Sequence, residues 1–184
     1  MARLLHLNGP PGIGKSTVAR LYAERHPLTL DLDIDQLRTL IGGWNDEFER
    51  AGKLVRPCAI AMMVAYLGQG QDVVMPQMIL RASELEKFES AARTAGADFV
   101  EVFLMDHRDR AVARFHGRGA DGASSAWHDD VRGLVAGLGG DLFLLDCHDR
   151  LVVLAQGRPE SVVIDTVAGG IAAALDEVCA VAGD

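Results

Sequence analysis

The chain has 184 residues, of which 49% are hydrophobic and 24% are charged. This composition is typical of a globular protein and excludes a disordered one. The 18 basic and 26 acidic residues give a net charge of −8, which argues against binding to duplex DNA or an anionic membrane, because both need a basic face. A small anionic ligand in a locally basic pocket is not excluded.

Predicted strands and helices alternate along the chain. Short apolar runs predict buried strands over residues 4–7, 28–32, 73–75, 98–104 and 162–164. Stretches of helix-forming residues predict helices over residues 15–25, 35–41, 46–67, 84–96, 108–115 and 171–182. This alternation predicts a parallel sheet covered by helices on both faces, an α/β fold in three layers. We expect one domain over residues 1–184.

Three local signals refine this outline. Pro57 is expected to kink or break the long third helix. Ser83 and Glu86 form a capping-box pattern, which predicts that the next helix begins near residue 84. Residues 127–156 are less regular, and we expect two helices separated at Gly139-Gly140.

The cysteines, Cys58, Cys147 and Cys179, form no CxxC pair. We expect buried, reduced thiols in a cytoplasmic protein. No apolar run near the N-terminus is typical of a signal peptide. The longest apolar stretch, residues 59–67, is far shorter than the roughly 20 residues that span a bilayer, so we expect no membrane partner.

Residues 9–16 read Gly-Pro-Pro-Gly-Ile-Gly-Lys-Ser and match the pattern GxxxxGK[ST] at every fixed position. The motif lies between a predicted strand and a predicted helix, which is the context that this pattern requires. Its glycines allow successive backbone N–H groups to point inward and bind an anion, and the helix N-terminus adds partial positive charge. The motif predicts a triphosphate-binding loop, without distinguishing ATPases, GTPases, motors and kinases.

Each residue of this loop has an expected role in binding ATP and Mg²⁺. Lys15 places its charge on the β- and γ-phosphates, and the hydroxyl of Ser16 binds Mg²⁺. The residues expected to bind the nucleotide are Gly9, Pro11, Gly12, Ile13, Gly14, Lys15, Ser16 and Thr17.

Asp33 and Asp35 follow the second predicted strand, and Arg38 lies one turn later. Ligands of parallel sheets bind at the carboxyl ends of the strands, so neighbouring first and second strands would bring these carboxylates close to the phosphates. We expect Asp35 to take the proton of an acceptor hydroxyl, Asp33 to join the Mg²⁺ shell through water, and Arg38 to bind the acceptor. Alternatively, the carboxylates only cap a helix.

Residues 9–17 and the segment Asp33-Ile34-Asp35-Gln36-Leu37-Arg38 together resemble the small P-loop kinases. These include chloramphenicol phosphotransferase, zeta-toxin-like kinases, adenylylsulfate kinase, gluconokinase and the 5′-kinase domain of polynucleotide kinases. The resemblance implies a nucleoside-monophosphate-kinase-like P-loop fold with a central five-stranded parallel sheet. It also implies that Asp35 is the base and that Arg38 binds substrate. The chain completes no single family's substrate signature, so the acceptor is not implied.

Arginines cluster after the fourth predicted strand, at Arg108, Arg110, Arg114 and Arg118. In the resembling kinases a short lid at this place, residues 108–125 here, closes over the triphosphate, neutralises developing charge and excludes water. Arg114 and Arg118 are favoured for catalysis, because they lie four residues apart on one helix face. The alternative is a solvated basic helix in an arginine-rich chain. By resemblance only, residues 166–170 receive the adenine.

Residues for the acceptor are predicted from their position after strands or glycines. Gln77 and Arg81 follow the third strand and are expected to bind the substrate. Trp44 and Phe48 wall an apolar acceptor pocket or pack in the core, and Trp127 contacts a bulky acceptor or packs.

Together these residues predict an ATP- and Mg²⁺-dependent phosphotransferase that acts on a hydroxyl of a small molecule, such as an antibiotic, a sugar, a nucleoside or a sugar nucleotide. One alternative is a polynucleotide 5′-hydroxyl kinase, against which the net charge and the lack of a basic, aromatic-lined path argue. Another is a nucleotide-dependent switch, although the sequence has no GTPase-type guanine motif. The oligomeric state is not predicted.

Overall fold

The computed structural model describes residues 1–117, 126–166 and 170–183. Within them, parallel strands form one sheet in the order β2-β3-β1-β4-β5. The strands are β1 (Arg3–Asn8), β2 (Leu30–Asp31), β3 (Val73–Met75), β4 (Asp98–Met105) and β5 (Val162–Asp165). The predicted five-stranded parallel sheet is confirmed.

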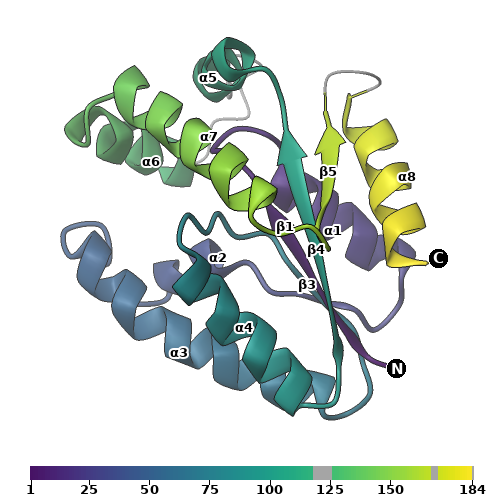
Figure 1. Cartoon of the computed structure of the whole chain (residues 1–184). Helices are drawn as coiled ribbons and strands as arrows, with labels where there is room; N and C mark the ends of the chain where they lie inside the picture. The colour runs from purple at the N-terminus through teal and green to yellow at the C-terminus, as the bar shows by residue number, and fades with distance from the viewer. Residues whose placement is uncertain (118–125, 167–169, 184) are drawn as a thin grey trace.

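Helices cover both faces of this sheet (Figure 1). They are α1 (Lys15–Arg25), α2 (Ile34–Thr39), α3 (Phe48–Leu67), α4 (Ala82–Thr94), α5 (Arg108–Gly117), α6 (Ala126–Gly137), α7 (Asp141–Gln156) and α8 (Gly170–Ala182). Helices α1 and α8 pack on one face, and α3 and α4 pack on the other. None of the helices in the described ranges is both long and apolar enough to cross a bilayer.

Strand β1 is the central strand of the sheet, so the loop that follows it lies at the middle of one sheet edge. Every residue of β1 after Arg3 is buried, because the strand has neighbours on both sides and helices on both faces. Leu5 and Leu7 face α1 and α8, whereas Leu4 faces α3 and α4. A continuous apolar run is what such a doubly covered strand requires.

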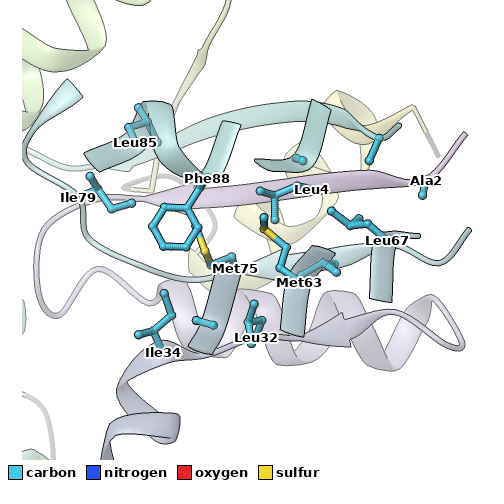
Figure 2. Packing of buried hydrophobic residues seen from close by; sticks show 14 of the residues in the cluster. Ala2, Leu4, Leu32, Ile34, Met63, Leu67, Met75, Ile79, Leu85 and Phe88 are labelled. Atoms are coloured by element: carbon cyan, nitrogen blue, oxygen red, sulfur yellow. The ribbon is translucent and has the colours of Figure 1, made fainter. Parts of the chain in front are cut away.

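The cluster between the sheet and helices α3 and α4 is drawn in Figure 2. The ring of Phe88, from α4, points toward Met75 at the end of β3. Met63, from α3, and Leu4, from β1, are both fully buried beside them. This packing fixes α3 against the sheet, which in turn positions the first residues of α3 near the carboxyl ends of the strands.

The prediction that the first two strands are neighbours in the sheet is wrong. Strand β3 lies between β1 and β2, and β2 pairs only over Leu30 and Asp31. Adjacency in sequence does not fix adjacency in a parallel sheet, because each crossover helix leaves the next strand free to join either edge.

Two local predictions about helix α3 and helix α4 are also corrected. Helix α3 continues through Pro57, so the predicted break does not occur, and the alternative of a kink stays a prediction. Tertiary packing retains the helix there, since Ala59 and Met63 on its inner face are fully buried while Pro57 is exposed. Helix α4 begins at Ala82 rather than near residue 84, and no side chain caps it, so the Ser83 capping box does not form. The predicted separation of α6 from α7 at residues 139–140 is confirmed.

The cysteines are free thiols, as expected, but only one of them is buried. Cys147 is buried, Cys179 is partly buried and Cys58 is exposed on α3. Cys58 directly follows Pro57 on the outward face of the helix. The expectation that all three are buried is therefore wrong.

We predict that Phe88→Ala lowers the free energy of unfolding by about 3–5 kcal/mol, because it leaves a cavity in a packed core. Phe88 is 1% exposed. Urea denaturation measures the change, and Leu142→Ala is the control because Leu142 is 77% exposed. An equal effect of both substitutions would contradict this view of the core.

Candidate functional site

The loop between β1 and α1 passes through backbone conformations that favour glycine. Gly9 has φ +147° and Gly12 has φ +90°. A Cβ on Gly9 would collide with the carbonyl oxygen of Leu104, and one on Gly12 would lie 2.9 Å from the Cα of Phe115. Only glycine fits at both positions, because β4 and α5 lie directly against the loop. Such a loop directs successive N–H groups toward one centre, where they bind an anion.

The start of the loop is fixed by a buried asparagine. Asn8 is fully buried, and its Oδ1 accepts hydrogen bonds from the backbone N–H groups of Gly9 (2.9 Å) and Ile79 (3.0 Å). Its Nδ2 donates to the carbonyl of Ile79 at 3.0 Å. Farther along, the side chain of Ile13 is buried against the core at 2% exposure. The loop is therefore held in shape by the protein itself and is preorganised to bind.

Positive charge converges on this loop. The ammonium of Lys15 donates to the carbonyls of Gly9 and Pro10, both at 2.9 Å, so it lies over the loop. Helix α1 begins after Gly14 with neither a side-chain cap nor an acidic residue in its first turn. The partial positive charge of the helix N-terminus is thus available to a ligand. Ser16 is exposed at this end of the helix.

Asp33 is the N-cap of α2. Its Oδ1 accepts hydrogen bonds from the backbone N–H groups of Asp35 (2.9 Å) and Gln36 (3.3 Å). The capping role that was the alternative interpretation is therefore present for Asp33. Both bonds end on the same oxygen atom of Asp33. Asp33 and Ser16 line one hollow of 490 Å³.

Asp35 forms an ion pair with Arg38 one turn later, with 3.2 Å between Oδ1 and Nη1. Burial raises the pKa of Asp35, and the neighbouring guanidinium opposes this shift. Arg38 is 3% exposed, and its guanidinium stacks on the ring of Phe48 at 4.1 Å from the centroid. Burial lowers the pKa of Arg38. A carboxylate with a raised pKa is better suited to accept a proton than an ordinary surface aspartate.

Asp31, at the end of β2, lies close enough to Asp33 for their charges to interact. Partial burial, together with the negative charge of Asp33, raises the pKa of Asp31 to about 6. Asp31 lines the same 490 Å³ hollow as Ser16 and Asp33. A carboxyl group whose pKa is raised by a neighbouring negative charge marks a place where a cation is favoured.

One cavity of 240 Å³ joins the phosphate loop to the carboxylates of α2. Lys15 and Ser16 line it from the loop, and Asp33, Asp35 and Arg38 line it from α2. The proximity of the α2 carboxylates to the loop was predicted from the sequence, but from an incorrect strand order. The actual cause is that α2, capped by Asp33, turns back toward the loop from beyond β3.

The cavity has an apolar wall that the sequence analysis did not identify. It consists of side chains from α5, α6, the residue that directly follows α6, and α7: Phe115, Val131, Leu134, Val135, Leu138 and Phe143. The α6 members recur with the spacing of one apolar helix face, a signal that was available in the sequence. The helix was predicted, but its role was not, because the sequence does not show that its apolar face meets the phosphate loop.

Of the residues predicted to bind the acceptor, some line the cavity and others do not. Gln77 is 8% exposed and lines the cavity, and its Oε1 is buried without a partner among the described residues. Arg81 is exposed at the start of α4 and is not part of the cavity lining. Arg56, on α3, lines the cavity instead. Phe48 also lines it, and Trp44 lies beside Phe48 with 6.4 Å between the ring centroids.

The described arginines of α5 form ion pairs, while Arg108 and Arg110 remain about half exposed to solvent. Arg114 donates to the hydroxyl (2.7 Å) and the carbonyl (3.1 Å) of Thr166, and its Nε lies 3.4 Å from Asp106. Arg110 also pairs with Asp106, and Arg108 pairs with Asp149. Arg114 is thereby held at the end of β5, beside the expected adenine position and outside the cavity lining.

Several predicted features fall outside the described residues. They are Arg118, most of the second half of the expected lid, and residues 167–169 of the expected adenine segment. For Trp127 the structure describes the helix but not the side chain. These assignments remain predictions.

The parallel sheet and the loop at residues 9–16 define a P-loop fold. The family model AAA_33, described as an AAA domain, matches residues 4–133. The chain belongs to this family. None of the curated proteins compared with the chain matches it.

Solved structures share the fold over nearly the whole chain. The tunicamycin resistance protein of Deinococcus radiodurans has a TM-score of 0.61 at 18% identity, covering 100% of this chain and 96% of that one. A gluconokinase from Sinorhizobium meliloti 1021 has a TM-score of 0.62 at 22% identity, covering 97% and 90%. The Mycobacterium tuberculosis APS kinase CysC, in complex with AMPPNP and APS, has a TM-score of 0.61 at 18% identity, covering 100% and 98%. The resemblance to the fold of small P-loop kinases is therefore confirmed.

We predict that Asp33→Ala lowers the free energy of unfolding by about 1 kcal/mol, because helix α2 loses its N-cap. Asp33→Asn is the matched variant, since asparagine caps a helix about as well as aspartate but carries no charge. Chemical denaturation of both variants measures the difference. Equal stability of the two would contradict the capping role.

Proposed function

We propose that this protein is a phosphotransferase that moves the γ-phosphate of ATP, with Mg²⁺, to a hydroxyl group of a small molecule. One observation carries the proposal: the phosphate loop and the Asp35–Arg38 pair line the same 240 Å³ cavity. A protein that only binds or hydrolyses a nucleotide does not need a half-buried carboxylate and an apolar wall opposite its phosphates. The fold that the chain shares with the gluconokinase and the APS kinase described above supports the same function.

The nucleotide end of the site is built to hold a triphosphate. The N–H groups of the loop and of the first turn of α1 bind the phosphate oxygens, and Lys15 neutralises the β- and γ-phosphates. Arg114, fixed by Asp106 and Thr166, lies at the side where the resembling kinases receive adenine. We assign it to the nucleotide, and Arg118 remains a candidate for charge neutralisation during transfer.

The residues near the loop fit Mg²⁺ without forming a complete protein cage. Within the described ranges, no cluster of three or more His, Cys, Asp or Glu residues is arranged to hold a metal ion. Mg²⁺ retains several waters and usually takes one or two protein ligands plus phosphate oxygens. Ser16 would bind it directly and Asp33 through water, and their common hollow supports this pair. When bound, the ion neutralises charge on the phosphates.

The chemical step needs a hydroxyl aimed at the γ-phosphorus and a base to receive its proton. In the proposed step the acceptor oxygen forms a bond to the γ-phosphorus, and the bond from that phosphorus to the β–γ bridging oxygen breaks to release ADP. The hydroxyl proton passes to the carboxylate of Asp35. Arg38 orients Asp35 through their ion pair of 3.2 Å and restrains its pKa.

The acceptor side favours a small molecule with apolar surface. Its wall is formed by Phe115 and by side chains of α6 and α7, with Gln77 as a buried polar contact. The cavity of 240 Å³ lies below the roughly 300–1,000 Å³ of typical ligand sites, which supports a compact acceptor. The net charge of −8 supports a small-molecule acceptor over a nucleic acid.

We predict that Asp35→Asn retains the affinity for ATP but slows transfer by roughly 10²-fold or more, because the hydroxyl loses its base. Acceptor-dependent ADP production measures the rate, and calorimetry with AMP-PNP measures binding. Lys15→Ala is the contrasting variant and should weaken both. Wild-type turnover in Asp35→Asn would exclude Asp35 as the base.

The rate should also depend on the pKa of Asp35. Because burial raises this pKa, kcat/KM should fall on the acid side at a midpoint above about 3.9, the ordinary value for aspartate. Arg38→Gln removes a charge that lowers the pKa of Asp35, so the midpoint should move to higher pH. An unchanged or lower midpoint would contradict this coupling.

The acceptor is found by an ADP-release screen over hydroxylated metabolites and antibiotics, with mass spectrometry for the phosphorylated product. We expect slow ADP formation alone and faster formation with the right acceptor. ADP formation at one rate with every compound, and no phosphorylated product, would contradict the proposal and favour a nucleotide-dependent switch.

A further inference from the structure

Strand β1 carries two polar side chains in an apolar part of the sheet. Leu4, His6 and Asn8 lie on the face covered by α3 and α4, because alternate residues of a strand point to the same side. His6 and Asn8 are both fully buried. A buried polar group costs free energy unless it is hydrogen-bonded, so both side chains need partners.

These two side chains hold the segment that follows β3. Strand β3 ends before Pro76, a residue that interrupts a strand because it has no N–H group for the ladder. Beyond this point, Nε2 of His6 lies 2.8 Å from the carbonyl oxygen of Gln77. Asn8 binds the backbone of Ile79, two residues farther along both segments. Side chains of β1 thus continue the attachment where the backbone pairing of β1 with β3 has ended.

Gln77 is the residue through which this segment reaches the acceptor side of the cavity. Its side chain lines the 240 Å³ cavity, and its Oε1 is buried without a hydrogen-bond partner among the described residues. Because the carbonyl group and the side chain of a residue are joined to the same Cα atom, fixing the carbonyl restrains where the side chain can point. His6 therefore restrains a polar group of the cavity without belonging to the cavity lining.

The imidazole ring of His6 is oriented by an acidic partner on the neighbouring strand. A carbonyl oxygen only accepts, so Nε2 of His6 carries the proton of the bond to Gln77. The other ring nitrogen, Nδ1, lies 3.6 Å from Oε1 of Glu101, on β4. Neither of these two atoms has a hydrogen-bond partner among the described residues. A proton between them would satisfy both atoms and fix the ring at its two nitrogens.

Glu101 is itself held from the end of α7. Its Oε2 accepts a hydrogen bond from Nε of Arg158, which lies two residues beyond the helix. Nη2 of Arg158 also pairs with Glu89 of α4 at 2.8 Å. The beginning of α7 supplies Phe143 to the apolar wall of the cavity. One end of α7 therefore lines the cavity directly, and the other end is linked to it through Glu101, His6 and the segment after β3.

We propose that His6 is a positioning residue of the acceptor site, which holds Gln77 for contact with the acceptor and is aligned by Glu101 and Arg158. This inference rests on the proposed function and extends it to buried groups that touch neither the nucleotide nor the reacting atoms. The amide of Gln77 both donates and accepts, which suits a hydroxyl or a carbonyl group of the acceptor. Loss of His6 should therefore weaken use of the acceptor and leave ATP binding unchanged.

Hydrogen exchange of the full chain tests the attachment of Gln77, and it needs no acceptor. Mass spectrometry follows deuterium uptake by the peptide over residues 76–81, with Mg²⁺ and AMP-PNP present. His6→Leu should speed exchange there about three- to tenfold, as expected for the loss of one hydrogen bond. His6→Gln keeps an N–H donor and should restore most of the protection. Unchanged exchange in His6→Leu would overturn the inference.

Two further variants control this measurement. His148→Leu is the matched control, because His148 is also a buried histidine and lies 2.9 Å from a backbone carbonyl, that of Asp106. It should leave exchange over residues 76–81 unchanged, and a similar increase in this variant would overturn the inference. Arg158→Gln acts from a partly exposed position, so the test does not depend on the folding of His6→Leu. It should speed the same exchange, and no change in it would contradict the alignment of His6.

Kinetics test the effect on the acceptor, with the compound that gives the highest rate in the ADP-release screen as the probe. His6→Leu should raise the KM for this compound about three- to tenfold, while the KM for ATP and the Kd for AMP-PNP stay unchanged. Equal losses for both substrates, or a loss in kcat alone, would indicate a merely structural role and overturn the inference. The effect of Arg158→Gln should disappear in the His6→Leu background, because Arg158 acts through His6. Additive effects would contradict this order.

The two claims fail separately. Absence of AMP-PNP binding, or of any acceptor-dependent ADP formation, in the wild-type protein would overturn the proposed function and this inference with it. Acceptor-dependent ADP formation in the wild type, with an unchanged KM for the acceptor in His6→Leu, would overturn the inference alone.

Discussion

The shape of the phosphate loop depends on the close approach of β4 and α5 to the backbone that follows β1. The Leu104 carbonyl leaves no room for a side chain at Gly9, and the backbone of Phe115 leaves none at Gly12. The loop is forced into conformations that point its N–H groups at one centre, where a phosphate replaces the partners that the backbone lacks. Because β1 is central and buried, this anion site is fixed on the most rigid part of the sheet.

The site also holds a charged pair in a buried position, and burying these charges works against the stability of the fold. Arg38 and Asp35 are drawn out of water beside the positive loop, and burial lowers the pKa of the arginine and raises that of the aspartate. Such a pair gains little net stability from its own attraction, since desolvation offsets it. The packing of α3 and α4 on the sheet, together with the Asp33 cap, holds the pair in place. The proposed function gives these groups a role, because a bound acceptor would use both of them.

Much of the fold and of the nucleotide end follows from local sequence. The apolar run of β1 and the motif at residues 9–16 are contiguous, so their geometry depends on neighbouring residues. The order of the strands was not predictable in this way, because the position of β2 beyond β3 is decided by long-range packing. The capping box at Ser83 does not form, because α4 begins at Ala82 with Arg81 as its N-cap, which places Ser83 inside the helix.

The acceptor side was predicted least well, because its residues come from distant segments. Asp35, Arg38 and Gln77 were found from their place after strands, and they line one cavity. Arg81 follows the same strand as Gln77 but is exposed. Arg56 lies in the middle of a long helix, where an arginine is ordinarily a solvated residue, and only the folded structure shows that it lines the cavity.

The most direct measurement is a crystal structure of the protein with Mg²⁺ and AMP-PNP. We predict that the β- and γ-phosphates lie in the loop against Lys15, and that the γ-phosphorus faces the carboxyl group of Asp35 across the cavity. A triphosphate bound elsewhere, or a γ-phosphate turned away from Asp35, would contradict the central claim.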